Sequence, residues 1–221
     1  HAALPIFGAS AGPSPVAAAY QGGEVREERE LMETQIMLGF QGVPYGDGDF
    51  YTAQILSSII GGGMSSRLFQ EVREKRGLCY SIYAFHWSFS DTGVFGVHAA
   101  TGPEDVQRLM PVIVDELERA VDGIADKEVQ RARAQLRAGL LMTLESPAAR
   151  AGQLARQLLL FGRIIPPEEL VARIETIDAE QVRALAARLF RGPPTLASVG
   201  PVKGMLGRDK IAERFGANIP G

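Results

Sequence analysis

The sequence of 221 residues has one cysteine, Cys79, so no disulfide can form within the chain, as is typical of proteins in a reducing compartment. The formal net charge is −3 and there is no basic block, so nothing favours nucleic acid as a partner. The longest apolar run, in "LARQLLLFG", is short and interrupted by Arg156, so no membrane span is expected. We expect a bacterial cytoplasmic location, with the mitochondrial matrix or the periplasm left open.

The chain also lacks the histidine spacing of a zinc peptidase. Its only histidines are His1, His86 and His98, and neither H-E-x-x-H nor H-x-x-E-H occurs. His86 and His98 fall in neighbouring predicted strands and could face one another, although packed sheet residues are the stronger interpretation. Cys79 has no histidine in local register and is interpreted as a small core residue. The chain by itself therefore shows no set of catalytic groups and no metal ligands.

A phosphate-binding loop is disfavoured as well. Gly61, Gly62 and Gly63 follow a predicted helix, whereas a P-loop follows a buried strand and places a lysine directly after its last glycine. A helix beginning at Ser65 could still attract an anion. A flexible joint between two helices is the simplest interpretation of the three glycines.

Apolar residues make up 46% of the sequence, an ordinary share, and their spacing predicts a succession of strands and helices. Strands are predicted at residues 34–40, 78–89, 93–101 and 195–200, and the polar segment "GGEVREERE" is predicted to be a solvated edge strand. Helices are predicted at residues 50–60, 66–76, 102–121, 126–144, 146–162, 166–177 and 178–190. This order predicts an α+β fold, a mixed sheet with its helices on one face.

The first 20 residues differ from the rest. They are rich in Ala, Pro and Gly, show no periodicity and lack an initiator Met. We predict that residues 1–20 form a linker or a loosely docked arm, that residues 21–221 form one domain, and that the chain is part of something longer.

One pair of residues has the chemistry to hold a peptide. Arg73 lies late on the predicted short helix and Tyr80 opens the next strand, with Gly77 turning the chain between them. A guanidinium can hold a peptide carbonyl, and a phenol can donate to a developing oxyanion. Spacing alone does not distinguish these roles from ordinary structural ones.

The surrounding motif resembles a known family. "SSRLFQEVREKRGLCYS" is similar to the C-terminal half of the pitrilysin and insulysin zinc peptidases, in the branch that resembles the mitochondrial processing peptidase, and the likeness runs from about Tyr20 to "TLASVGP". The resemblance implies a two-layer α/β sandwich with a mainly antiparallel sheet. It also implies that two halves or two subunits, as a homodimer or heterodimer, enclose a proteolytic chamber.

The same resemblance implies site residues. Arg73 would bind the substrate backbone and Tyr80 would steady the tetrahedral intermediate, as the catalytic pair of this half. A glycine-rich loop would contact the peptide, here the segment of Gly61, Gly62, Gly63, Met64 and Ser65. Zinc would be bound outside this chain, because H-x-x-E-H is missing.

Two hypotheses follow. The first is a substrate-binding half of a zinc metalloendopeptidase, inactive alone. The second is a non-catalytic scaffold subunit of the same fold, like core subunits of respiratory complexes. The presence of both Arg73 and Tyr80 favours the first.

Overall fold

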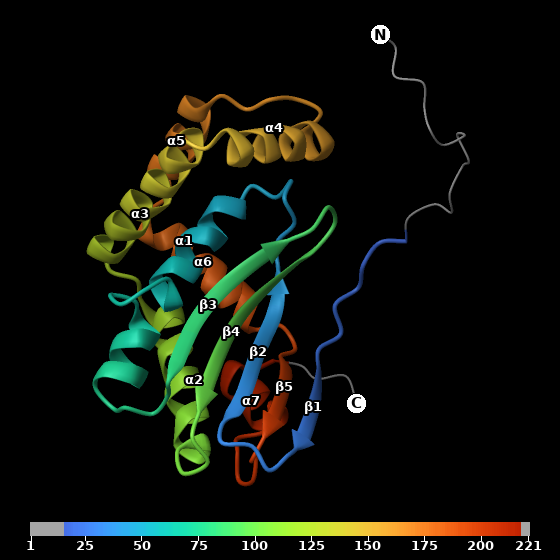
Figure 1. Ribbon diagram of the computed structural model, residues 1–221, viewed down its shortest axis with the longest axis vertical. Helices are drawn as coiled ribbons and strands as arrows, with labels where there is room; N and C mark the ends of the chain where they lie inside the picture. The colour runs from blue at the N-terminus through green and yellow to red at the C-terminus, as the bar shows by residue number, and fades with distance from the viewer. Residues whose placement is uncertain (1–15, 218–221) are drawn as a thin grey trace.

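The computed structural model describes residues 16–217 and contains one five-stranded sheet (Figure 1). The strand order across the sheet is β1-β5-β2-β4-β3. The strands are β1 (Gly23–Glu28), β2 (Thr34–Gly42), β3 (Ser81–Ser88), β4 (Gly93–Thr101) and β5 (Thr195–Gly200). Only β1 and β5 run parallel, so the sheet is mixed and mainly antiparallel, which confirms the prediction.

The helices lie on one face of this sheet, behind the strands in Figure 1. They are α1 (Phe50–Gly61), the π-helix η1 (Phe69–Glu74), α2 (Val106–Asp122), α3 (Asp126–Leu144), α4 (Pro147–Phe161), α5 (Pro167–Glu175), α6 (Ala179–Phe190) and α7 (Arg208–Phe215). The predicted two-layer α+β sandwich is therefore confirmed. Helices α3 and α4 extend past the end of the sheet at the top of the figure.

Alternation along the strands determines which side chains meet the helices. In β2 the residues Ile36, Leu38 and Phe40 are almost completely buried, whereas Gln35 and Met37 are only partly buried and Gln41 is exposed. The Phe40 ring contacts the Phe190 ring of α6, with centroids 5.0 Å apart. The main core thus lies between β2, β4 and the helices α1, α2 and α6.

The opposite face of the sheet carries no helix among residues 16–217 (Figure 1). On β3, Tyr83 and Trp87 are 45% and 56% exposed, and the Phe85 ring lies between them. The Phe85 ring covers Gly96 of β4, where a Cβ atom would come within 2.3 Å of the ring. We call this side of the sheet the open face.

Helix α7 follows the last strand, where no further helix was predicted. His86 and His98 point to opposite faces, since β3 pairs His86 with Phe95 and Tyr83 with His98, so the expectation that they might meet is wrong. Most of the predicted arm, residues 1–15, lies outside the described residues. Residues 16–20 form no helix or strand, and the Ala18 N–H donates to Asp91 Oδ2 at 2.8 Å.

Candidate functional site

The short helical segment before β3 carries the first candidate residue. Its hydrogen bonds are of the wide π type from Phe69 to Glu74, a form that proteins use mostly as single turns and often at functional sites. The segment ends at Gly77, whose φ of +63° favours glycine, and its N–H donates to Arg73 O at 3.0 Å. The Leu78 N–H then donates to Val72 O at 3.0 Å, which turns the chain toward the sheet.

Arg73 lies on the exposed side of η1, and Val72 on its buried side. Its guanidinium stands over the Phe69 ring, with Cζ 4.9 Å from the centroid, a cation–π contact. It is also close to Cys79: burial raises the pKa of the Cys79 thiol to about 11, and the Arg73 charge partly opposes that rise. Arg73 is therefore near enough to Cys79 for its charge to act on the thiol, and its side chain is exposed to solvent.

Tyr80 is 61% exposed and lies immediately before β3 rather than inside it. Its main chain is well held, because the Tyr80 N–H donates to Ala100 O at 2.8 Å. Two residues earlier, the buried Thr101 hydroxyl donates to Leu78 O at 2.7 Å. The phenol thus projects from a fixed backbone into solvent, as a donor to a bound ligand requires.

The glycine-rich segment divides into two parts with different surroundings. Gly61 is buried at the end of α1, where a Cβ atom would come within 2.2 Å of Ala84 N in β3. Its lack of a side chain is thus explained by the close approach of helix and strand. Gly62 is likewise crowded, since its Cβ would lie 2.5 Å from Ser58 Cα.

The rest of the segment is open to solvent. Gly63 has a φ of +144° with nothing near its missing Cβ, Met64 is 75% exposed, and Ser65 is exposed. Ser66 does not accept a capping hydrogen bond. Its hydroxyl instead donates to Gly63 O at 2.6 Å, which closes the turn. Of the predicted peptide-contacting segment, Gly63, Met64 and Ser65 are exposed, and the partly buried Gly62 lines a groove beside them.

A groove of about 710 Å³ lies beside this segment, between α1, α3 and α4. Its wall near the glycines is polar: the Ser58 hydroxyl donates to Gln135 Oε1 at 3.1 Å, and Gln135 Nε2 donates to Gly62 O at 3.0 Å. Arg156 of α4 also lines it. The groove follows from the distance between α4 and α1, which no local sequence pattern encodes.

Comparison with known proteins places these residues in a family. The family model described as the peptidase M16 inactive domain matches residues 7–136, more than half of the chain. The chain belongs to the M16 peptidase family. Its match is to the C-terminal half of these proteins, as the resemblance of the motif implied.

The M16 domain is similar in sequence to several known proteins. It is 37% identical to an uncharacterized zinc protease of Rickettsia felis, over 83% of this chain and 45% of that protein. It is 36% identical to an uncharacterized zinc protease of Streptomyces coelicolor, over 85% and 40%. It is 30% identical to the mitochondrial-processing peptidase subunit alpha of Caenorhabditis elegans, over 84% and 40%. The chain thus spans less than half the length of these relatives.

The fold also recurs among solved structures. A chain of complex III2 from Candida albicans, solved with Inz-5 bound, superposes with a TM-score of 0.84 over 95% of this chain and 53% of that one. The sequence identity is 21%, so this likeness concerns the fold alone.

The described part of the M16 domain brings together no set of zinc ligands. Within residues 16–217 no group of three or more His, Cys, Asp or Glu side chains is placed to hold a metal ion. The Nε2 atom of His86 is already a hydrogen-bond acceptor, for the Val43 N–H at 3.1 Å. His98 Nε2 lies 2.8 Å from Gln35 Oε1. In the same range no helix has the length and apolarity to cross a membrane.

Sequence reasoning missed the open face of the M16 domain as a candidate surface. The Phe85 ring lies 4.2 Å from Trp87 and 6.2 Å from Tyr83, and the His98 ring stacks on Tyr83 at 4.9 Å. The signal was present as aromatic residues at every second position of "YAFHW". It was interpreted only as a strand, because the sequence does not say which sheet face the helices leave uncovered.

Proposed function

We propose that this chain is the substrate-binding half of a zinc metalloendopeptidase, active only with a zinc-bearing half or subunit. The observation that carries the proposal is the joint exposure of Arg73 and Tyr80 at the η1–β3 junction of an M16 domain that has no zinc ligands among its described residues. The zinc proteases among its relatives are about twice its length, which leaves room for such a half.

In this proposal Arg73 holds the peptide. Its guanidinium is solvent-facing and stacked on Phe69, so it keeps its hydrogen-bond donors free for a carbonyl oxygen of an extended chain. The exposed turn of Gly63, Met64 and Ser65 would contact the same peptide. Together they orient the substrate, and this chain contributes no metal to the reaction.

Tyr80 acts at the reacting carbonyl in this proposal. Its hydroxyl donates to the oxygen that gains negative charge as the tetrahedral intermediate forms, and a donor of that kind acts mainly on the transition state. The hydrogen bonds at Tyr80 N and Leu78 O fix the backbone from which the side chain projects, and the exposed phenol turns about its own side-chain bonds to reach that oxygen.

The proposal is tested by reconstitution with an H-x-x-E-H-bearing chain from the same genome, using an internally quenched peptide. Tyr80→Phe should lower kcat by roughly 10²–10³-fold with little change in KM. The matched control is Tyr83→Phe, a neighbouring exposed tyrosine, which should keep wild-type kcat. Equal kcat values for Tyr80→Phe and wild type would remove Tyr80 from the mechanism.

Arg73→Ala should act on binding instead. Loss of charge-assisted hydrogen bonds to the peptide should raise KM about tenfold or more. Arg108→Ala, which changes an exposed arginine of α2, is the control and should leave KM unaltered. Unchanged KM in Arg73→Ala would place this side chain outside the peptide site.

The second candidate is a non-catalytic scaffold subunit, favoured by the likeness to a chain of complex III2. It predicts a stable complex with the zinc-bearing chain but no cleavage of any quenched peptide. Cleavage that depends on Tyr80 would exclude it.

A further inference from the structure

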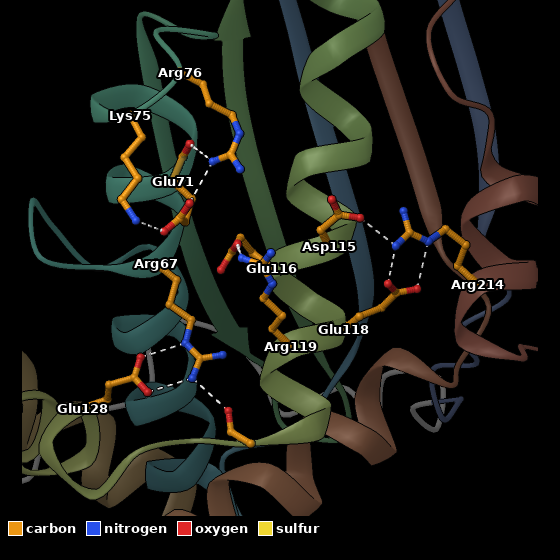
Figure 2. Close-up of polar contacts among 11 residues, drawn as sticks. Arg67, Glu71, Lys75, Arg76, Asp115, Glu116, Glu118, Arg119, Glu128 and Arg214 are labelled. Atoms are coloured by element: carbon orange, nitrogen blue, oxygen red, sulfur yellow. Dashed lines mark hydrogen bonds and ion pairs between the residues drawn. The ribbon is translucent and has the colours of Figure 1, made fainter.

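Arg67 lies two residues before η1, at the start of residues 67–76, which we call the η1 segment, and its guanidinium makes several hydrogen bonds. Arg67 Nε donates to Glu128 Oε1 at 2.7 Å and Arg67 Nη2 donates to Glu128 Oε2 at 2.7 Å, so the pair is bidentate (Figure 2). Nη2 also donates to the carbonyl of Gly123 at 2.9 Å. The two side chains are only 16% and 13% exposed, far less than typical surface pairs.

Glu128 is itself held in place. It lies in the first turn of α3 and its Oε2 accepts the Ala125 N–H at 2.9 Å. Burial raises the pKa of its carboxyl, but the hydrogen bonds from Arg67 and Ala125 outweigh this and leave the pKa below its ordinary value. Because Gly123 follows α2, the contacts of Arg67 join the η1 segment to both α2 and α3.

Apart from Arg67, the η1 segment is attached to the domain by apolar side chains. Leu68 and Val72 are completely buried in the core, whereas Arg73 is exposed and has a cation–π contact with Phe69 of the same segment. The ion pairs of Glu71 with Lys75 and Arg76 lie within the segment, so they stiffen it without attaching it to a neighbour (Figure 2). The direction of the segment is therefore determined at its start by Arg67 together with the buried Leu68, and at its end by Val72 and Leu78.

We infer that Arg67 and Glu128 are positioning residues, which fix the η1 segment so that Arg73 faces the peptide beside Tyr80. The role of Arg73 in this inference rests on the proposed function; the fixing of the segment does not. A displacement of about 1 Å at a positioned group can cost on the order of 100-fold in rate, so a pair that holds a whole helical turn has a functional consequence.

The molecule provides a matched control on the other side of α2. Arg214 of α7 donates from Nε to Glu118 at 2.9 Å and from Nη2 to Asp115 at 2.7 Å, and both acceptors lie on α2 (Figure 2). These three side chains have the same chemistry and also join a helix to α2, on the side of α2 away from η1 (Figure 2). The Arg214 side chain is 33% exposed.

The first test uses Cys79 as a reporter in the chain alone. It is the only cysteine, is 8% exposed, and lies next to Tyr80 in the junction that η1 covers, so a thiol reagent reaches it only when the junction opens. Arg67→Met and Glu128→Gln should speed its alkylation by a neutral maleimide about tenfold, and Arg67→Lys less. Arg214→Met should keep the wild-type rate. Equal rates in all four variants would overturn the inference.

The second test is a double-mutant cycle of Arg67 and Arg73, measured as changes in KM of the reconstituted enzyme. If Arg67 acts through Arg73, Arg67→Met should raise KM several-fold in the wild-type background and have little further effect in Arg73→Ala. Arg67→Lys, which keeps a positive charge at this position, should restore part of the loss. Additive effects in the cycle would overturn the link to Arg73. Absence of cleavage with faster Cys79 alkylation would instead reject the proposed function and keep the fixing of η1.

Discussion

The two faces of the sheet are built from the same strands, yet their aromatic side chains differ in burial. On the covered face Phe40 and Phe95 have no exposed surface and contact Phe190. On the open face Tyr83 and Trp87 are aromatic too, but about half of each remains exposed. Aromatic content therefore does not identify the core. The helix layer decides which aromatic residues stabilise the fold and which remain available to a ligand or partner.

The largest expected contrast is in stability. Phe95→Ala removes a completely buried ring from the covered face and should lower the free energy of unfolding by about 3–5 kcal/mol. Trp87→Ala, on the open face of the neighbouring strand, should cost about 1 kcal/mol or less. Urea unfolding followed by circular dichroism measures both, and unchanged m-values would show that the comparison is like for like. Similar losses for the two variants would mean that the open face is covered in solution.

The two histidines extend the contrast to pH. On the covered face His86 is buried, and this desolvation lowers its pKa from 6.5 to about 4. Burial lowers the pKa of the open-face His98 as well, and the charge of Glu33 partly opposes it. Between pH 6.5 and 4 the unfolded chain binds a proton at position 86 that the folded chain does not. The contribution of the neutral, buried His86 to the free energy of unfolding is therefore fully present above pH 6.5 and is lost as the pH falls toward 4.

His86 alone should account for roughly 3 kcal/mol of that loss. Other groups titrate in this range too, so the measurement is the difference in unfolding free energy between wild type and His86→Asn at several pH values. The difference should shrink steadily from pH 6.5 to 4. The same series with His98→Asn should show a smaller change. A constant difference for His86→Asn would mean that His86 is already solvated in the folded state.

Much of the fold was predictable because it follows from local patterns. The alternation in Thr34–Gly42 and the glycine at position 77 indicated the strand and the turn correctly. Helix α7 was missed, although Ile211 and Phe215 have helical spacing, because few apolar residues follow the last strand. The opposite orientation of His86 and His98 depends on the register of β3 on β4, which periodicity alone does not provide.

The residues of the candidate site could be predicted from the sequence, but the contacts that hold the η1 segment in place could not. "REKRGLCY" indicated Arg73 and Tyr80 because these residues are close together in the sequence. The partner of Arg67 lies 61 residues away, on a different helix, and its identity depends on how α3 packs. Gly61 illustrates the reverse case. It was predicted to contact substrate, and its contact with Ala84 of β3 gives a packing reason for glycine that only the tertiary structure reveals.

The smallest expected effect is the interaction energy between two aromatic side chains of the open face. Tyr83 and His98 are direct cross-strand partners whose rings stack at 4.9 Å with an interplanar angle of 29°. Such pairs contribute about 0.5–1 kcal/mol beyond the burial of their area. A double-mutant cycle with Tyr83→Ala and His98→Ala should give a coupling energy of that size at neutral pH. Zero coupling would mean that the rings do not stay stacked in solution, whereas a coupling well above this range would show that the open face is held as rigidly as the covered one.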